Sequence, residues 1–210
     1  MNSRILYFLA LYLLISGFIA ASDGNKEKRE LQTFTDIEFS GAFDVKIIVG
    51  EEQEVIVETK DEDDLDKVIT RVRSNSLVVE LESSWLNNIQ AKVYIKVKTL
   101  ESLQSSGANS MKIRGIDTDR FKLSNSGAGT ISIEGEVNSA LFNLSGASSL
   151  DAKELIAKKV RININGASNA KVYASEELEG EVSGVANLDY YGHPEHVDVD
   201  DSGLGNVNRK

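Results

Sequence analysis

Two histidines near the C-terminus are the first candidates for metal binding in this chain. His193 and His196 lie in the sequence His-Pro-Glu-His, and the chain contains no cysteine. Two ligands on one loop are too few for a structural zinc site, which takes four, and no thiolate is present to complete the set. The sequence therefore predicts no metal ion, and it indicates no other cofactor.

The residues that follow begin like a calcium-binding loop. Residues 198–203 read Asp-Val-Asp-Asp-Ser-Gly, as in the first half of an EF-hand. The twelfth position of that loop needs a glutamate that binds Ca²⁺ through both oxygens, and Arg209 stands there. An EF-hand is therefore excluded. A second acidic run, residues 61–64, is interpreted as the solvated start of a helix, where the helix dipole favours negative charge.

Paired carboxylates would indicate a polysaccharide hydrolase or lyase, because such enzymes need an acid and a base on one face. The acidic side chains to consider are Glu134, Asp151, Asp189 and Glu195. They are scattered and form no repeated column, so we predict no catalytic residues. Carboxylates from separate parts of the fold can still converge in a cleft, and a carbohydrate-active enzyme therefore stays open as an alternative.

The element that positions these side chains is a repeat in the second half of the chain. Six times, a small polar residue is followed by glycine and, four residues later, by an apolar or small residue. The glycines lie 18–20 residues apart, a period typical of stacked β-coils. Glycine at such a corner permits positive φ, which a Cβ atom would disfavour, and Gly166 is predicted to adopt it. The six corner glycines are Gly107, Gly127, Gly146, Gly166, Gly184 and Gly203.

Residues of one parity are apolar on both sides of each glycine. Because strand side chains alternate between two faces, this parity is predicted to point inward in every coil. The inward residues are Phe121, Leu123, Ile131, Ile133, Phe142, Leu144, Leu150, Ala152, Val160, Ile162, Ile164, Ala170, Val172 and Ala174. The outward residues are Lys122, Ser132, Glu134, Asp151, Arg161, Asn163, Lys171 and Tyr173. Gly180 and Asp201 also fall on the inward parity, which predicts that the last two coils are irregular.

The third residue after each glycine is polar in all six units. Stacked coils place these residues above one another at the strand spacing of about 4.8 Å, where hydroxyls and amides can hydrogen-bond along the stack. They are Ser110, Thr130, Ser149, Asn169, Asn187 and Asn206.

The chain before the repeats has strand patterns without the repeat. Residues 65–72 fit both helical and strand spacing, and we favour one helical turn followed by a strand, with a turn at residues 74–76. Trp85 is either a binding aromatic or, as we favour, a cover on the end of the core. Other strands are expected at residues 43–49, 55–57, 77–81 and 91–97.

The first residues read as an export signal. Arg4 precedes an uncharged stretch from residue 5 to residue 21, and Ala20-Ala21-Ser22 offers a cleavage site. We therefore expect a signal peptide at 1–22, a polar tether at 23–31 and the folded domain at 32–210. The rival is an uncleaved N-terminal anchor, since 17 apolar residues are at the short limit for a membrane span. Either reading predicts an extracytoplasmic location: the periplasm, the outer-membrane surface or the medium.

Charge limits the partners. The chain has 23 basic and 33 acidic residues, a net charge of −10. Loss of residues 1–22 removes one arginine, so the mature charge is 22 − 33 = −11. With no cluster of Lys and Arg among aromatic residues, the composition excludes nucleic acid and leaves the N-terminal segment as the only expected membrane contact.

Four motifs in a fixed order resemble those of a known family. They are Phe39 to Gly50 (Phe-Ser-Gly-Ala-Phe-Asp-Val-Lys-Ile-Ile-Val-Gly), the acidic run before residues 65–68, the Ser-Gly-Ala units, and residues 188–194 (Leu-Asp-Tyr-Tyr-Gly-His-Pro). Together they resemble the putative auto-transporter adhesin "head GIN" domain of Bacteroidetes envelope proteins. The resemblance covers roughly residues 32–210 and implies an exported, right-handed β-solenoid. It brings no catalytic or ligand-binding residues.

The expected fold is all-β: a single-domain parallel β-helix, or β-solenoid, with about 19–20 residues per coil. The expected function is a non-enzymatic binding, adhesion or scaffolding module whose partner is an envelope protein or glycan. The alternatives are a carbohydrate-active β-helix enzyme and a self-assembling structural subunit. An enzyme should show acidic residues clustered in a groove, a self-assembling subunit should show an uncapped apolar coil end, and a binding module should show neither.

Overall fold

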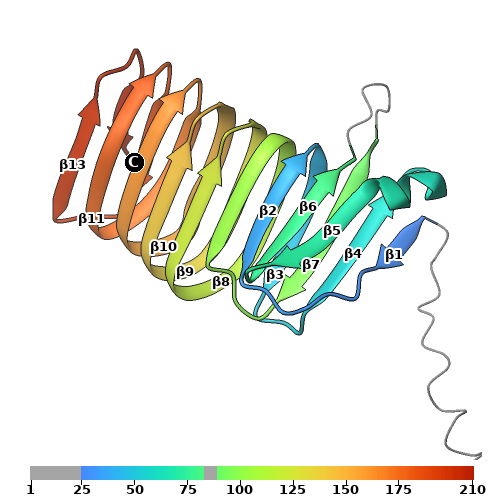
Figure 1. Cartoon of the computed structure of the whole chain (residues 1–210). Coiled ribbons are helices and arrows are strands. Elements are labelled where there is room, and N and C mark those ends of the chain that lie inside the picture. Colours follow the sequence, from blue (N-terminus) through green and yellow to red (C-terminus); the bar gives the residue numbers. More distant parts are fainter. Residues whose placement is uncertain (1–24, 83–88) are drawn as a thin grey trace, which may run out of the picture.

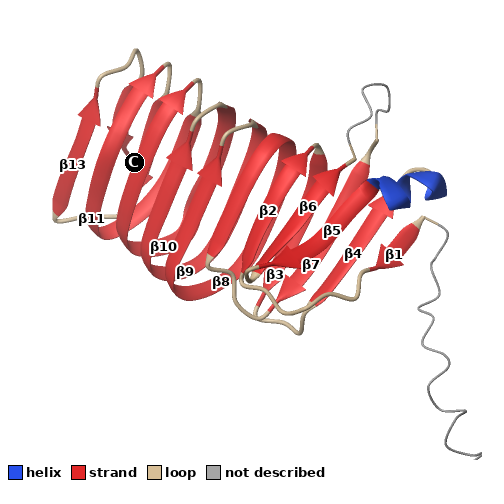
Figure 2. Cartoon of the chain, in the orientation of Figure 1, coloured by secondary structure: helices blue, strands red, loops and turns tan. Residues whose placement is uncertain are grey.

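The computed structural model describes residues 25–82 and 89–210, and about three quarters of them lie in strands of one long β-solenoid (Figures 1 and 2). The predicted fold is confirmed. The elements are β1 (Lys26–Lys28), β2 (Asp36–Gly41), β3 (Phe43–Val49), β4 (Glu54–Thr59), the 3-10 helix η1 (Glu62–Lys67), β5 (Val68–Arg73), β6 (Ser76–Leu81), β7 (Ala91–Val97), β8 (Ser102–Asn125), β9 (Ala128–Leu144), β10 (Ala147–Gly166), β11 (Asn169–Gly184), β12 (Asn187–Tyr191), β13 (His196–Asp201) and β14 (Asn206–Arg209).

The long strands β8 to β11 bend around the solenoid, so each contributes to two opposite walls. The groove wall consists of β5, β6, β2, residues 102–107 and 119–125 of β8, 138–144 of β9, 158–165 of β10, 176–183 of β11, and β13. The ladder wall consists of β1, β4, β7, β3, residues 110–114 of β8, 128–134 of β9, 147–152 of β10, 169–173 of β11, β12 and β14. Neighbouring coils are parallel; their register is regular within each wall and shifts where the chain bends from one wall to the other.

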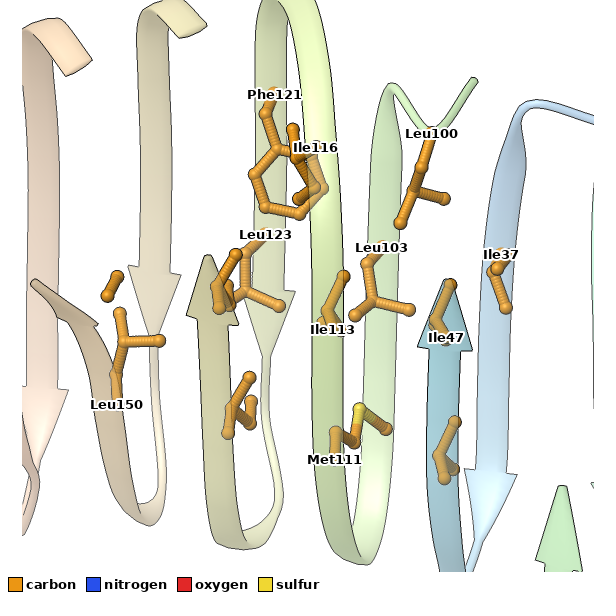
Figure 3. Close-up of a cluster of buried hydrophobic side chains, with 14 of the residues drawn as sticks. Ile37, Ile47, Leu100, Leu103, Met111, Ile113, Ile116, Phe121, Leu123 and Leu150 are labelled. Atoms are coloured by element: carbon orange, nitrogen blue, oxygen red, sulfur yellow. The ribbon is translucent and has the colours of Figure 1, made fainter. Parts of the chain in front are cut away.

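The core is a single column of apolar side chains between the two walls. Figure 3 shows part of it, where Leu103, Ile113 and Leu123 stack between coils. Every residue predicted to point inward is buried, and the predicted outward residues are exposed or half-buried. Because a strand alternates its side chains, the two-residue pattern alone determined both faces correctly.

The corner glycines are explained by close stacking more than by backbone angle. Gly166 has the predicted positive φ, as do Gly107 and Gly184, whereas the other three corner glycines do not. At all six, a Cβ atom would lie within 2.5 Å of a carbonyl oxygen in the preceding coil. Each glycine in this column therefore leaves room for the backbone beneath it. That contact, which sequence alone does not show, is the feature the six positions share.

A second, buried column lines the inside of this corner. Asn109 donates hydrogen bonds to Ser105 Oγ at 3.0 Å and to the Ser106 carbonyl at 3.1 Å, and accepts one from the Phe43 N–H at 3.0 Å. Ser148 and Ser168 lie two and three coils further on, and their Oγ atoms are 3.3 Å apart. These side chains satisfy polar groups that the bend turns away from solvent.

We expect Asn109→Ala to lower the free energy of unfolding by about 2 kcal/mol, because it leaves the buried Phe43 N–H without this acceptor. The matched control is Asn169→Ala, at an exposed position of the outer column, which should change stability by less than about 0.5 kcal/mol. Urea melts of both variants measure the difference. Equal costs would mean that Asn109 does not hold the corner.

The polar column predicted on the outside is confirmed. Its members are paired in register from coil to coil along the ladder wall. The asparagine amides bond along the stack: Asn187 donates to Asn169 Oδ1 at 2.9 Å, and Asn206 donates to Asn187 Oδ1 at 3.5 Å. Side-chain bonds therefore reinforce the backbone bonds between the last three coils.

The N-terminal end of the solenoid is closed by antiparallel strands. β1 pairs with β4, β4 with β7 and β5 with β6, all antiparallel, and η1 lies at the same end (Figure 2). The expected helical turn followed by a strand is confirmed by η1 and β5, and residues Ser74 and Asn75 form the turn with positive φ. β1 falls within the segment expected to be a tether. The signal-peptide prediction at 1–22 and the prediction for Trp85 lie outside the described residues.

The C-terminal coils are irregular, as predicted. The strand is interrupted between β12 and β13. In the pairing of β11 with β13, Gly180 lies opposite Val199, and Val182 lies opposite the exposed Asp201. Val197, at an inward position, is 44% exposed. Among the described residues, no helix is long and apolar enough to cross a membrane.

Candidate functional site

Three shallow cavities lie side by side on the groove wall. Their volumes are about 280, 570 and 380 Å³, and they extend over strands β2 and β8 to β11. The second and third share Ser139 and Leu141 of β9. Asn143, two residues further along β9, lines the first. The second and third cavities are joined by these shared residues, and the first lies beside them on the same wall; we call the three together the groove.

The first cavity is polar and nearly uncharged. It lies next to the glycine corner, where successive coils place hydroxyl and amide side chains in rows. Asn163 donates a hydrogen bond to Asn143 Oδ1 at 2.9 Å at its edge, and Glu38 is the one charged residue in its lining. The polar outward residues are Gln104, Ser106, Ser124, Ser126, Asn143 and Ser145. Such groups both donate and accept hydrogen bonds.

The second and third cavities have an apolar floor between basic side chains. Leu141 is half-buried at an outward position, in register between Lys122 of β8 and Arg161 of β10. One row away, Ser139 lies in register between Arg120 and Lys159. Strand spacing therefore sets four cations around Leu141 and Ser139.

Acidic residues close both ends of this basic stretch. Asp36 and Glu101 lie at one end. Burial, and to a smaller extent the charge of Glu101, raises the pKa of the Asp36 carboxyl. At the other end, Lys159 Nζ lies 2.7 Å from Glu177 Oε2, and Arg161 pairs with Glu179. The hydrogen bond from Lys159 is the main cause that lowers the pKa of Glu177. The groove thus alternates acid, base and acid along its length.

The carboxylates singled out in the sequence are not brought together. Glu134, Asp151 and Asp189 lie on the ladder wall, where Glu134 pairs with Arg114 at 3.0 Å and Asp189 with Lys210 at 3.4 Å. Glu195 precedes β13 near the groove wall. Residues 198–201, considered as part of a calcium loop, belong to strand β13.

Sequence reasoning missed the groove, although one signal was present. Leu141 is a large apolar residue at an outward position between the polar residues Ser139 and Asn143 of the same parity, which marks an apolar floor. The clustering of Glu177, Glu179 and His196 had no signal of this kind, because it depends on the pairing of β11 with β13 across an irregular coil.

Comparisons with known proteins agree with this architecture. The family model described as "Putative auto-transporter adhesin, head GIN domain" matches residues 33–194. A crystal structure of a putative adhesin from Bacteroides fragilis superposes with a TM-score of 0.72 at 15% identity, covering 88% of this chain and 96% of that one. A putative adhesin from Parabacteroides merdae superposes with a TM-score of 0.53 at 16% identity, covering 90% of this chain and 98% of that one. No curated protein matches. At these identities the similarity supports the fold alone.

Proposed function

The chain belongs to the head GIN domain family of putative auto-transporter adhesins, and on that premise we propose that it is an exported, non-enzymatic binding module of the cell envelope. The family name suggests an extracellular or envelope location, consistent with the export signal expected at residues 1–22. The observation that carries the proposal is the groove. The three cavities share one wall of a rigid solenoid, as expected of a binding face whose residues are held by stacked strands.

The chemistry of the groove suits a glycan. Rows of serine, asparagine and glutamine side chains match the hydroxyl groups of a sugar chain as both donors and acceptors. Leu141 offers an apolar surface to the C–H face of a ring, and the flanking cations suit a carboxylate or sulfate substituent. A neutral or acidic polysaccharide lying across the coils is therefore the partner that we propose.

The carbohydrate-active enzyme is less favoured by the same groove. Asp36, whose pKa is raised, is the candidate acid at one end of the groove. The carboxylates at the other end, Glu177 and Glu179, are both paired with cations. A general acid needs a raised pKa, and the hydrogen bond from Lys159 lowers the pKa of Glu177 instead. These two residues therefore resemble charged groove walls more than a catalytic pair.

Self-assembly end to end is less favoured by the last coil. At inward positions of this coil stand Asp201 on β13 and Arg209 on β14, opposite Val182 and Tyr190 of the preceding coil. Both are exposed. Inward-pointing charges on edge strands oppose the pairing of one edge with another. The described C-terminal end thus carries exposed charges beside the exposed Val197, and is not the wholly apolar coil end that a stacking subunit should present.

A matched pair of variants on strand β9 tests the groove. Ser139 lines two of the cavities, whereas Ser132 is exposed on the ladder wall of the same strand. We expect Ser139→Arg to fill the groove and weaken glycan binding about tenfold or more, which is about 1.4 kcal/mol. Ser132→Arg adds the same charge and should leave binding unchanged.

The measurement is a glycan and envelope-protein array probed with the mature protein, followed by titration calorimetry on each hit. If only the Ser132 variant lost binding, the binding face would lie on the ladder wall. Equal binding by both variants would exclude the groove. Turnover of any bound polysaccharide would show that the protein is a carbohydrate-active enzyme and not a binding module.

A further inference from the structure

Two acidic side chains and one imidazole meet at the C-terminal end of the groove wall. Glu177 and Glu179 are two residues apart on β11, so both point outward, and His196 on β13 lies directly opposite Glu177 in register. One ligand atom from each side chain lies within 4.8 Å of the other two. Two are half-buried and His196 is exposed, so an ion can enter from solvent.

The surroundings of this cluster are strongly negative. Residues 176–201 contain nine acidic residues and no lysine or arginine. The nearest cations, Lys159 and Arg161 on β10, each pair with the Oε2 atom of a glutamate. Each ion pair engages one oxygen of its carboxylate and holds that side chain in place. Partners of this kind orient the ligands in known metal sites.

We propose that Glu177, Glu179 and His196 form a site for a divalent transition-metal ion such as Zn²⁺. Imidazole and carboxylate are both zinc ligands, and three protein ligands plus water make an open zinc site. Ligand atoms at about 2.0–2.2 Å from zinc lie about 3.4 Å apart in a tetrahedral arrangement. The three ligand atoms already lie within 4.8 Å of one another, so rotation of side chains at the protein surface can bring them to this spacing.

The bound ion would join two coils. Its ligands come from β11 and from β13, the outermost strand of the groove wall, whose Val197 is poorly covered. An ion that binds only the folded state raises stability by mass action. The site goes beyond the proposed function, since zinc binding here needs no contact with a glycan and is tested without one.

The test is titration calorimetry of the mature, tag-free protein with ZnCl₂, paired with thermal melts with and without Zn²⁺. We expect one saturable site and a higher Tm in zinc. His196→Ala should abolish both effects, and Glu177→Gln should weaken them. The matched control is His193→Ala, which removes the other histidine and should bind zinc like the unchanged protein. Circular dichroism confirms that each variant is folded.

Calcium separates a specific site from a merely acidic surface. Imidazole is a poor ligand for Ca²⁺, so we expect CaCl₂ to give no saturable binding. If Ca²⁺ and Zn²⁺ bound alike and His196→Ala changed neither, the proposed site would be excluded. Equal losses in the His193 and His196 variants would also overturn it, because His193 lies outside the cluster.

Discussion

Gly127→Ala is expected to destabilise the protein by about 3 kcal/mol or more, or to prevent folding. The added Cβ would lie 1.9 Å from the carbonyl oxygen of Gly107 in the coil beneath it. Neither coil can yield, because each is paired in register with neighbours on both sides. The backbone angle of Gly127 lies outside the positive range, so the cost arises from the clash. Guanidinium melts measure it.

Gly50→Ala is the matched control for backbone strain without a clash. Gly50 has φ of +94°, and a Cβ there would meet nothing within 4 Å. We expect a cost of about 1–2 kcal/mol, the usual penalty for a left-handed residue. If Gly50→Ala were the more harmful change, turn geometry and not coil stacking would explain the glycine column.

Ile164→Asp is expected to cost about 4 kcal/mol or more, since it places a carboxylate in the core. Ile164 is 1% exposed and lies in the column between the two walls. A charged group there has no partner within the apolar stack and cannot reach water without opening a coil. Urea melts followed by circular dichroism give the cost, and failure to fold counts as the same outcome.

The neighbour of this residue provides the control. Asn163→Ser changes an exposed side chain that bonds only across the surface, to Asn143. We expect a change within about 0.5 kcal/mol. Tolerance that alternates with a two-residue period is the pattern of a strand, whereas the pattern of a helix repeats every 3.6 residues. Comparable damage at both positions would show that the register of this coil is wrong.

Most of the solenoid could be predicted from sequence because its contacts repeat. In each successive coil the apolar residues alternate with polar ones in the same way. Leu123 and Phe142 could therefore be placed in one core before their pairing was known. The role of glycine was only half predicted. A sequence shows that Gly127 lacks a side chain, but only the stacked backbone shows that Gly107 lies too close to allow one.

The groove could not be predicted because it depends on positions across strands. The basic residues form two pairs that are far apart along the chain, Arg120 with Lys122 and Lys159 with Arg161. In the sequence they look like ordinary solvated charges. Register brings them around Leu141. The cluster at His196 is harder still, because a loop of unequal length precedes β13 and the repeat no longer fixes the alignment.

The order of pairing along the solenoid has a mechanical consequence. Each coil is hydrogen-bonded to the coil before it and the coil after it, so tension at the C-terminal end acts first on the outermost coil. When that coil peels away, its roughly 20 residues extend to about 70 Å before the next coil bears the load. Under a sustained pull the coils of the solenoid therefore lengthen the molecule in nearly equal steps.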